Sequence, residues 1–381
     1  MAEKSTNTAI VGASAAGLAV GRCLQDSGVP FILLEKNEHV AGAWRNHYER
    51  LHLHTSKRLS ALPDRPFPEY VAKYPSREQV VAYLESYARE FGLDPQFGQE
   101  VTSVRRDQEG WQVFTRDDHY RASNVVIATG YARRPHEPAL EGMAAYEGEI
   151  LHSSRYQSGE RFVGQRVLVV GCGNSGAEIA LDLWEHGAQP TISVRGPVHV
   201  VPRDLLGLPI LAWSIFLSKL PTRLADLISA PLVRASTGDL SRYGLRKPPY
   251  GPMAQILQRG QIPLIDVGTV QAIKEGKIGV RPGIARFTVN GVVFADGATG
   301  DREQQLDAVV LATGYRPALA DFLEAAGEVT DASGVPRISG RESSLPGLYF
   351  CGFYVSPAGM LHEIASEARR IARDIRIKRS S

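Results

Sequence analysis

Two glycine-rich turns, each preceded by a short aliphatic run, constrain this chain more than any other feature. Residues 8–11 (TAIV) lead into GASAAG, and residues 167–170 (VLVV) lead into GCGNSG. A buried strand, a turn of small residues and a following helix form the unit that holds the pyrophosphate of a dinucleotide. Two such units in 381 residues predict an α/β protein with two Rossmann-like dinucleotide-binding domains. Two local signals add to this prediction: Ser76 and Gln79 have the spacing of a helix capping box, and Asn290-Gly291 indicates a β-hairpin.

The composition excludes several other classes of protein. Apolar residues make up 43% of the chain and charged residues 22%, which is ordinary for a globular protein. The formal charge of +2 indicates no nucleic-acid partner. The three cysteines, Cys23, Cys172 and Cys351, form no C-x-x-C pair, so we expect neither a metal site nor a disulfide framework. The N-terminal residues MAEKSTN do not resemble a signal peptide, and we therefore expect a cytoplasmic protein.

The first glycine turn carries the features of an adenosine-binding site. A helix is predicted from Ala15, a strand over residues 31–34, and Glu35 follows at the end of that strand. An acid at this distance from Gly12 can hydrogen-bond ribose hydroxyls. Ser14 replaces the middle glycine of the usual G-x-G-x-x-G pattern, so the pyrophosphate is expected to lie slightly differently there.

The second turn matches G-x-G-x-x-G in full and ends its following strand with a different residue. Arg195 occupies the place that Glu35 has in the first unit. Because a guanidinium can hold a 2′-phosphate bidentately, Arg195 predicts NADPH rather than NADH at this turn. The alternative is an ordinary surface arginine. The residues predicted to bind this nucleotide are Gly171, Gly173, Asn174, Ser175, Gly176 and Arg195.

A third pattern lies between the two turns. Residues 146–156, YEGEILHSSRY, follow F/Y-x-G-x-x-x-H-x-x-x-Y, and ATGY occurs twice, at 128–131 and 312–315. With these segments the chain resembles the class B flavin-containing monooxygenases, whose identifying motif has Phe where Tyr146 stands. Baeyer–Villiger relatives end that motif in Trp, so Tyr156 favours the other branch. Within it the resemblance is greatest to YUCCA-type monooxygenases, and it extends through RLHLHTSK, LPDRPFP, GLRKPPYGP and LATGYRP.

The resemblance implies a domain organisation, two cofactors and a chemistry. The FAD-binding domain is expected over residues 1–156 and 314–381, with an NADPH-binding domain inserted at 157–313. YUCCA-type enzymes decarboxylate indole-3-pyruvate oxidatively through a flavin C4a-(hydro)peroxide. N- or S-oxygenation of soft nucleophiles and Baeyer–Villiger oxidation of a ketone are alternatives within the same chemistry. A flavin disulfide reductase would need a redox-active cysteine pair, and a non-catalytic flavin-binding redox module is the alternative from another class.

The resemblance also implies site residues. In the wider family an asparagine over the flavin precedes T/S-K, and this chain has His54 at that place. His152, in the identifying motif, either contacts the NADPH domain during catalysis or is a structural hydrogen-bonding hub. The remaining residues predicted to bind cofactor are Gly12, Ser14, Gly17, Glu35, Lys36, Gly42, Trp44, Arg45, Thr55, Val101, Thr129, Gly130, Thr313, Gly314 and Gly352.

One apolar stretch bears on the partners of the protein. Residues 205–218, LLGLPILAWSIFLS, are uncharged but too short for a membrane span of about 20 residues, and Pro209 interrupts them. We expect a buried or substrate-lining helix there rather than attachment to a membrane surface. The expected partners are a small-molecule substrate and dioxygen, and a homodimer is one expected assembly.

Overall fold

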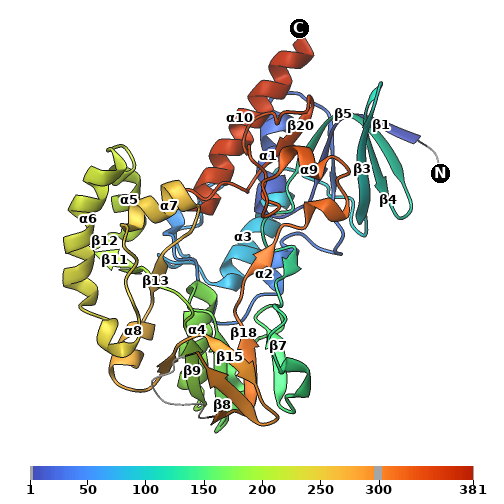
Figure 1. The fold of residues 1–381 in the computed structure, drawn as a ribbon. Coiled ribbons are helices and arrows are strands. Elements are labelled where there is room, and N and C mark those ends of the chain that lie inside the picture. The colour runs from blue at the N-terminus through green and yellow to red at the C-terminus, as the bar shows by residue number, and fades with distance from the viewer. Residues whose placement is uncertain (1–2, 296–302, 381) are drawn as a thin grey trace. The chain divides into compact units, whose positions relative to one another are not determined.

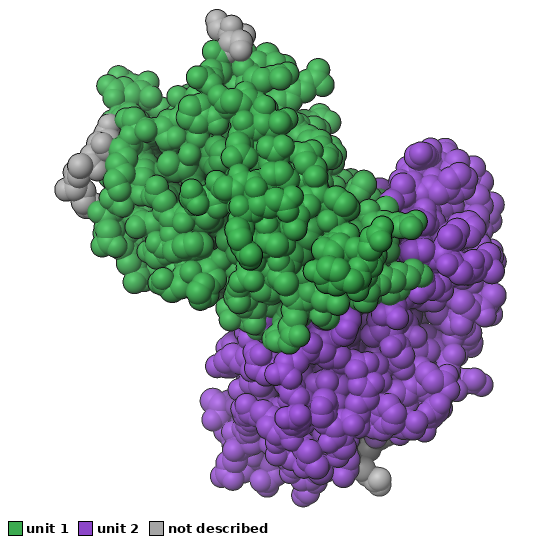
Figure 2. All heavy atoms as spheres, turned by 180° about the vertical axis from the view of Figure 1, so that it is seen from behind, with its two compact units in different colours: residues 1–46, 55–134, 315–381 green, residues 47–54, 135–314 purple. Residues whose placement is uncertain are grey.

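The computed structural model describes residues 3–295 and 303–380. The chain forms two compact units: residues 1–46, 55–134 and 315–381 make unit 1, and residues 47–54 and 135–314 make unit 2 (Figures 1 and 2). Unit 2 thus includes residues 135–156 and the short segment 47–54, both of which precede the boundary expected at residue 157.

Unit 1 is built on a mixed six-stranded sheet. Its order is β2-β1-β5-β4-β3, and β20 also pairs with β5. The pairs β1–β2, β1–β5 and β20–β5 are parallel, whereas β3, β4 and β5 form an antiparallel meander. The strands are β1 (Glu3–Val11), β2 (Phe31–Leu34), β3 (Val101–Asp107), β4 (Gly110–Thr115), β5 (His119–Ile127) and β20 (Leu348–Phe350).

The helices of unit 1 begin where the sequence provides a start signal. Helix α3 has the predicted capping box, in which Ser76 and Gln79 satisfy each other's backbone N–H groups. Helix α10 packs against α1, which follows the first glycine turn (Figure 1). The helices are α1 (Ala15–Asp26), α2 (Gly42–Arg45), α3 (Arg77–Glu90), α9 (Ala326–Val329) and α10 (Met360–Ser380), with 3₁₀ turns at Lys57–Leu59 and Leu319–Asp321.

Unit 2 contains a parallel five-stranded sheet in the order β14-β9-β8-β18-β7. Aliphatic strands such as β8 and β18 are buried on both faces, as a parallel sheet requires. Helix α4 (Asn174–Glu185) follows β8 and packs against it and β9. The strands are β7 (Glu149–His152), β8 (Arg166–Val170), β9 (Gln189–Ser193), β14 (Gly279–Arg281) and β18 (Ala308–Leu311). The α/β prediction is confirmed.

Smaller elements complete unit 2. The predicted Asn290-Gly291 hairpin is present: Phe287 pairs with Val292, and Thr288 N donates to Gly291 O at 2.9 Å. The other strands of unit 2 are β10 (Val200–Pro202), β11 (Asp204–Leu205), β12 (Leu208–Pro209), β13 (Leu264–Asp266), β15 (Ile284–Phe287), β16 (Gly291–Phe294) and β17 (Glu303–Gln305). Strand β6 (Arg134–Pro135), at which the chain passes from unit 1 to unit 2, pairs with β19 (Tyr315–Arg316), at which it returns to unit 1. The helices are α5 (Ile210–Leu217), α6 (Thr222–Thr237), α7 (Pro252–Arg259) and α8 (Thr269–Lys274), with 3₁₀ turns at Met143–Ala145, Gly159–Phe162 and Ser241–Tyr243.

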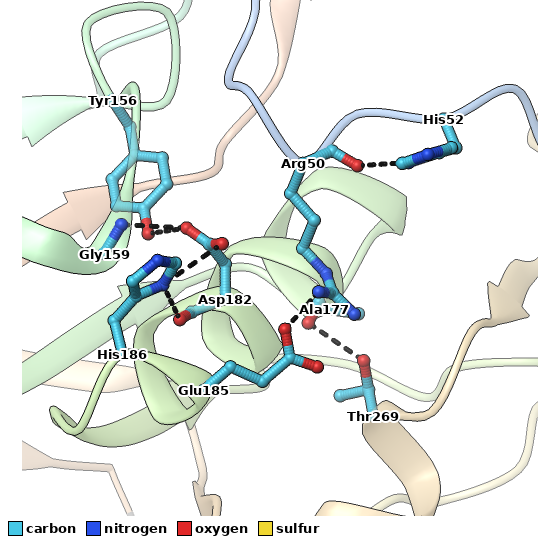
Figure 3. A network of polar contacts seen from close by, with 9 residues as sticks. All are labelled: Arg50, His52, Tyr156, Gly159, Ala177, Asp182, Glu185, His186 and Thr269. Carbon is cyan, nitrogen blue, oxygen red and sulfur yellow. Dashed lines mark hydrogen bonds and ion pairs between the residues drawn. The ribbon is translucent and has the colours of Figure 1, made fainter. Parts of the chain in front are cut away.

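The tyrosines at the two ends of residues 146–156 form hydrogen bonds with other elements of unit 2. The Tyr146 hydroxyl donates to Leu306 O at 3.1 Å, just before β18. A Cβ on Gly148 would lie 2.3 Å from the Tyr146 hydroxyl oxygen, so only glycine fits under that ring. At the other end of the motif, the Tyr156 hydroxyl donates to Asp182 Oδ2 on α4 at 2.6 Å, and Gly159 N donates to the same oxygen at 2.9 Å (Figure 3).

His152 makes the third set of hydrogen bonds in this motif. Its side chain is fully buried, Nδ1 accepts from Ser154 N at 3.1 Å, and Nε2 lies 3.0 Å from Gly314 O. Because Nδ1 is an acceptor, Nε2 carries the proton and donates a hydrogen bond to Gly314 O, in the segment that follows β18. This arrangement supports the structural-hub alternative for His152.

The buried state of His152 predicts a pH-dependent stability. Burial is the main cause that lowers the pKa of His152 from its usual 6.5, opposed by the Gly314 carbonyl. The His152 ring therefore binds a proton more readily in the unfolded chain than in the folded one. Its contribution to the free energy of unfolding is largest above about pH 6.5, and it is lost as the pH falls through the lower pKa of the folded protein. His152→Gln should reduce the free energy of unfolding by about 1–2 kcal/mol at pH 8 and by less in acid. Urea unfolding across this pH range measures the difference, and a constant difference would contradict the prediction.

Candidate dinucleotide sites

The first glycine turn, in unit 1, is packed too closely for larger residues. Gly12 has φ +105°, and a Cβ there would lie 2.9 Å from Ala128 O at the end of β5. A Cβ on Gly17 would lie 1.8 Å from Gly12 O. Ser14 is the N-cap of α1, and no side chain caps that helix end in the described structure. Its first N–H groups therefore remain available for an anion.

Glu35 joins the end of β2 to this turn. Its carboxylate is almost fully buried and accepts from Ala13 N at 2.7 Å and from Asn37 N at 3.0 Å. The Gly42 segment lies against the same turn, because Ala41 N donates to Ala13 O at 3.2 Å. Glu35, the glycine turn and the start of α2 are thus one local arrangement, as the sequence predicted for an adenosine site.

An unpaired hydroxyl lies beside the turn. Thr129 Oγ1 is buried and has no hydrogen-bond partner among the described residues. Gly130, with φ +66°, has open space around its Cα. Gly352 N donates to Glu367 Oε2 at 2.6 Å, and a Cβ on Gly352 would meet the Ala16 side chain at 3.3 Å. A buried hydroxyl without a partner and the open space at Gly130 fit a group that the protein binds at this place.

The other residues predicted for the first site are distributed more widely. Arg45 pairs with Glu85 on α3, while Trp44 is half-buried on α2 and Lys36 is exposed beside Glu35. The Thr55 hydroxyl lies 2.5 Å from Ser60 Oγ. Val101 is the first residue of β3, pairs with Thr115 and packs into the core of unit 1. The contacts of Val101 are therefore those of a core residue.

The second glycine turn, in unit 2, repeats the geometry of the first. Gly171 has φ +110°, and its Cβ would lie 2.6 Å from Ala312 O, just after β18. A Cβ on Gly176 would lie 2.0 Å from Gly171 O, whereas Gly173 has open space within 4 Å. Gly173 is the N-cap of α4, again without a side-chain cap in the described structure. The open side of the turn and the uncapped helix end suit a pyrophosphate.

Two predicted residues near this turn have structural partners. Asn174 Oδ1 accepts from Ile265 N at 2.8 Å, which holds β13 against the start of α4. Thr313 Oγ1 donates to His136 O at 2.5 Å, and His136 N donates to Gly314 O at 2.9 Å. Ser175 is half-buried in the first turn of α4. The Asn174 side chain retains its amide N–H groups for a ligand.

Arg195 lies two residues beyond β9 and is exposed. Its neighbours along the sheet are also basic, since Val194 N donates to Arg281 O at 2.8 Å. In the next part of the loop, Val198 N donates to Arg246 O at 2.8 Å. The described chain gives Arg195 no ion-pair partner, so its charge is available to an anionic group at the end of β9.

His54 lies in unit 2, in the segment 47–54. Its Nε2 contacts the carboxylate of Glu178 on α4, and Tyr48 OH donates to the second oxygen of that carboxylate at 3.4 Å. Arg50 in the same segment pairs with Glu185 on α4 (Figure 3). The segment is thus attached to α4 by one histidine, one arginine and one tyrosine.

The acids on α4 are the residues that sequence reasoning missed. Glu178 and Asp182 are both almost fully buried, four residues apart on one side of the helix. The signal was present in NSGAEIALDLWE, where two acids occupy positions among residues of the buried face. Buried carboxylates require partners, and here His54 and Tyr156 supply them.

Comparison with known proteins identifies the family to which these features belong. The flavin-binding monooxygenase-like family model matches residues 5–333. The chain is 41% identical to "Indole-3-pyruvate monooxygenase YUCCA1" of Oryza sativa subsp. japonica, over 96% of this chain and 90% of that protein. It is 39% identical to "Probable indole-3-pyruvate monooxygenase YUCCA1" of Arabidopsis thaliana, over 96% and 88%.

A solved structure shows the same fold. The flavin-containing monooxygenase from Stenotrophomonas maltophilia aligns with a TM-score of 0.76 and 24% identity, covering 99% of this chain and all of that one. Two dinucleotide turns, each with its own uncapped helix, match what such a protein needs for two nucleotides. The chain therefore belongs to the flavin-binding monooxygenase-like family and is a monooxygenase that uses FAD and NADPH.

Proposed function

We propose that this monooxygenase decarboxylates an aromatic 2-oxo acid oxidatively and that indole-3-pyruvate is such a substrate. The observation that carries the proposal is the 38–41% identity to eight relatives named as indole-3-pyruvate monooxygenases, seven of them matched over at least 90% of this chain. The balanced reaction consumes one 2-oxo acid, one dioxygen, one NADPH and one proton. It yields the shortened carboxylate, carbon dioxide, water and NADP⁺.

In this proposal FAD binds at the Gly12 turn and NADPH at the Gly171 turn. Glu35 and Thr129 are the polar groups that hold FAD, and the N–H groups at the start of α1 receive its pyrophosphate. Gly173 and the start of α4 receive the pyrophosphate of NADPH, and Arg195 receives its 2′-phosphate. When bound, the reduced flavin supplies the activation of dioxygen, and the protein supplies binding, orientation and exclusion of water.

The cysteines argue against a disulfide reductase. Burial raises the pKa of Cys23 and of Cys172 to about 12, and it also raises that of Cys351. A thiol that stays protonated at neutral pH is a poor nucleophile towards a disulfide. All three cysteines are free thiols, and none of them belongs to a C-x-x-C motif. Ketone, amine and sulfide oxygenation remain the alternatives that product analysis must separate.

Product stoichiometry tests the proposed reaction. With carboxyl-labelled indole-3-pyruvate we expect carbon dioxide, indole-3-acetate and NADP⁺ in equal amounts, with little hydrogen peroxide. A tertiary amine, a thioether and a cyclic ketone serve as the comparison substrates. Oxygenation of any of these at a higher kcat/KM than that of the 2-oxo acid would overturn the substrate assignment. NADPH oxidation that is negligible with every substrate would favour a non-catalytic flavin module.

Arg195 gives a prediction on coenzyme choice. Arg195→Ala removes the cation that we assign to the 2′-phosphate, and loss of a charged hydrogen bond costs about 1.5–3 kcal/mol. We expect kcat/KM for NADPH to fall roughly 10- to 100-fold while that for NADH is nearly unchanged. The matched control is Arg161→Ala, since Arg161 is also exposed in unit 2 but pairs with Glu149. An equal fall for both coenzymes would refute the assignment.

His54 gives a prediction on the coupling of NADPH consumption to product. We propose that the His54 ring takes the place of the asparagine of the wider family and that Glu178, which contacts Nε2, holds the ring in position. His54→Ala should raise hydrogen peroxide release per NADPH several-fold, and Glu178→Gln should raise it less, because glutamine can still accept a hydrogen bond from the imidazole. His52→Ala is the control, since His52 lies in the same segment but its ring contacts Arg50 O (Figure 3). Unchanged coupling in His54→Ala would remove His54 from the mechanism.

A further inference from the structure

An outward-facing set of large apolar side chains distinguishes one part of unit 2. We call it the outer apolar patch, and it comprises Leu206, Leu208, Phe216, Leu224, Leu227 and Ile228. Leu206 and Leu227 are 74% and 73% exposed, and Phe216 is 60% exposed. The patch extends over the β11–β12 hairpin and helices α5 and α6, which follow one another along the chain (Figure 1). Large apolar side chains gathered in one region of a surface usually mark an interaction site.

Helix α6 is apolar on two sides. Its inner side carries Ala225 and Ser229, both buried, and packs against β10 and α7. Its outer side carries Leu224, Leu227 and Ile228 at the i, i+3 and i+4 spacing of a single helix face. A surface helix normally presents polar residues to water at such positions. The outer side of α6 is therefore arranged for an apolar environment.

The β11–β12 hairpin holds an apolar tip in a strained conformation. Leu206 has φ +51°, a left-handed conformation that is costly for a branched apolar residue. The hairpin is fixed by pairing of Leu205 with Leu208 and by Trp213 Nε1, which donates to Leu205 O at 3.0 Å. Backbone strain retained at an exposed position indicates a functional constraint rather than packing.

The exposed charges around the patch are mostly positive, and the one exposed acid over residues 203–237 is Asp204 of β11. Residues 205–237 contain three cations, Lys219, Arg223 and Arg234, and all three are exposed. The same residues contain one acid, Asp226, whose carboxylate accepts from Met253 N at 2.8 Å and from Ala254 N at 3.2 Å. Asp226 therefore holds the start of α7. The patch combines apolar side chains with an excess of exposed cations.

This charge pattern favours a lipid surface over a second copy of the chain as the partner of the patch. In a two-fold dimer the same patch on both copies would face itself, so Lys219, Arg223 and Arg234 of each copy would meet and outnumber the one exposed acid, Asp204, three to one. A lipid surface with anionic headgroups pairs with the cations and also receives the apolar side chains. We propose that the outer apolar patch docks this enzyme on an anionic lipid surface, with Leu206 and the outer side of α6 inserted among the headgroups.

Docking of this kind differs from spanning a membrane. None of the helices within residues 3–295 and 303–380 is long and apolar enough to cross one. The sequence favoured a buried or substrate-lining helix over residues 205–218, and Leu211 and Leu217 are indeed buried while Phe216 is exposed. The proposal thus assigns the outer side chains of this region to the lipid surface and leaves the inner ones in the protein core.

Vesicle sedimentation of the full-length FAD-loaded protein tests the proposal. We expect binding to phosphatidylcholine vesicles that contain phosphatidylglycerol, weak binding to phosphatidylcholine alone, and release by salt. Leu206→Asn and Leu227→Gln should each lower the partition coefficient about tenfold. Asparagine tolerates the left-handed conformation, so Leu206→Asn should not unfold the hairpin. The double variant Lys219→Gln, Arg223→Gln should lower binding to the anionic vesicles by about 25-fold, since each cation contributes about fivefold.

A control variant separates an effect of the outer apolar patch from a general loss of surface apolar side chains. Val163→Gln removes an apolar side chain that is 65% exposed elsewhere in unit 2, and it should leave vesicle binding unchanged. Thermal unfolding and flavin absorbance establish that each variant is folded. Three results would overturn the proposal: no binding to anionic vesicles, binding that the patch variants do not reduce, or a dimer in solution that Leu227→Gln dissociates. The last result would assign the patch to a contact between copies of this chain.

Discussion

The arrangement of unit 2 depends on how residues 146–156 are tied to β18 and α4. The Tyr146 hydroxyl donates to Leu306 O ahead of β18, the His152 ring donates to Gly314 O beyond β18, and the Tyr156 hydroxyl donates to the buried Asp182 on α4. These contacts fix the end of β18, where Ala312 O approaches Gly171 so closely that no side chain fits. The geometry of the second dinucleotide turn is therefore set partly by residues that have no contact with it. The identifying motif of the family thus supports the second glycine turn through packing and hydrogen bonds.

The two glycine turns share a backbone geometry but differ in the residue at the end of the second strand. Both place glycine against the carbonyl of a neighbouring strand end and leave the following helix without a side-chain cap. They differ at the end of the second strand, where Glu35 accepts backbone N–H groups in unit 1 and Arg195 is exposed without an ion pair in unit 2. The polarity at these two positions is the physical basis for assigning one turn to FAD and the other to NADPH.

Local patterns predicted the α/β class, both glycine turns, the capping box at Ser76 and the Asn290-Gly291 hairpin, because each depends on neighbouring residues. Contacts between distant residues could not be derived in this way. The pairing of His54 with Glu178 joins residues 124 apart, and the Tyr156–Asp182 bond becomes visible only when α4 is placed. Asn174 was predicted to bind the nucleotide, and in the structure its side-chain oxygen accepts from Ile265 N of β13. The exposed tip at Leu206 has no local sequence signal, since a leucine there would ordinarily be assigned to the core.

Residues 47–54 have a consequence for engineering this family. The segment follows α2 of unit 1 in the chain, yet Tyr48 is buried in the core of unit 2 and His54 and Arg50 pair with α4. A fragment cut as one continuous stretch would leave Glu178 buried without its histidine. A chimaera that exchanges the NADPH-binding part between relatives must therefore transplant two separate stretches of sequence together, because residues 47–54 belong to the same compact unit as α4.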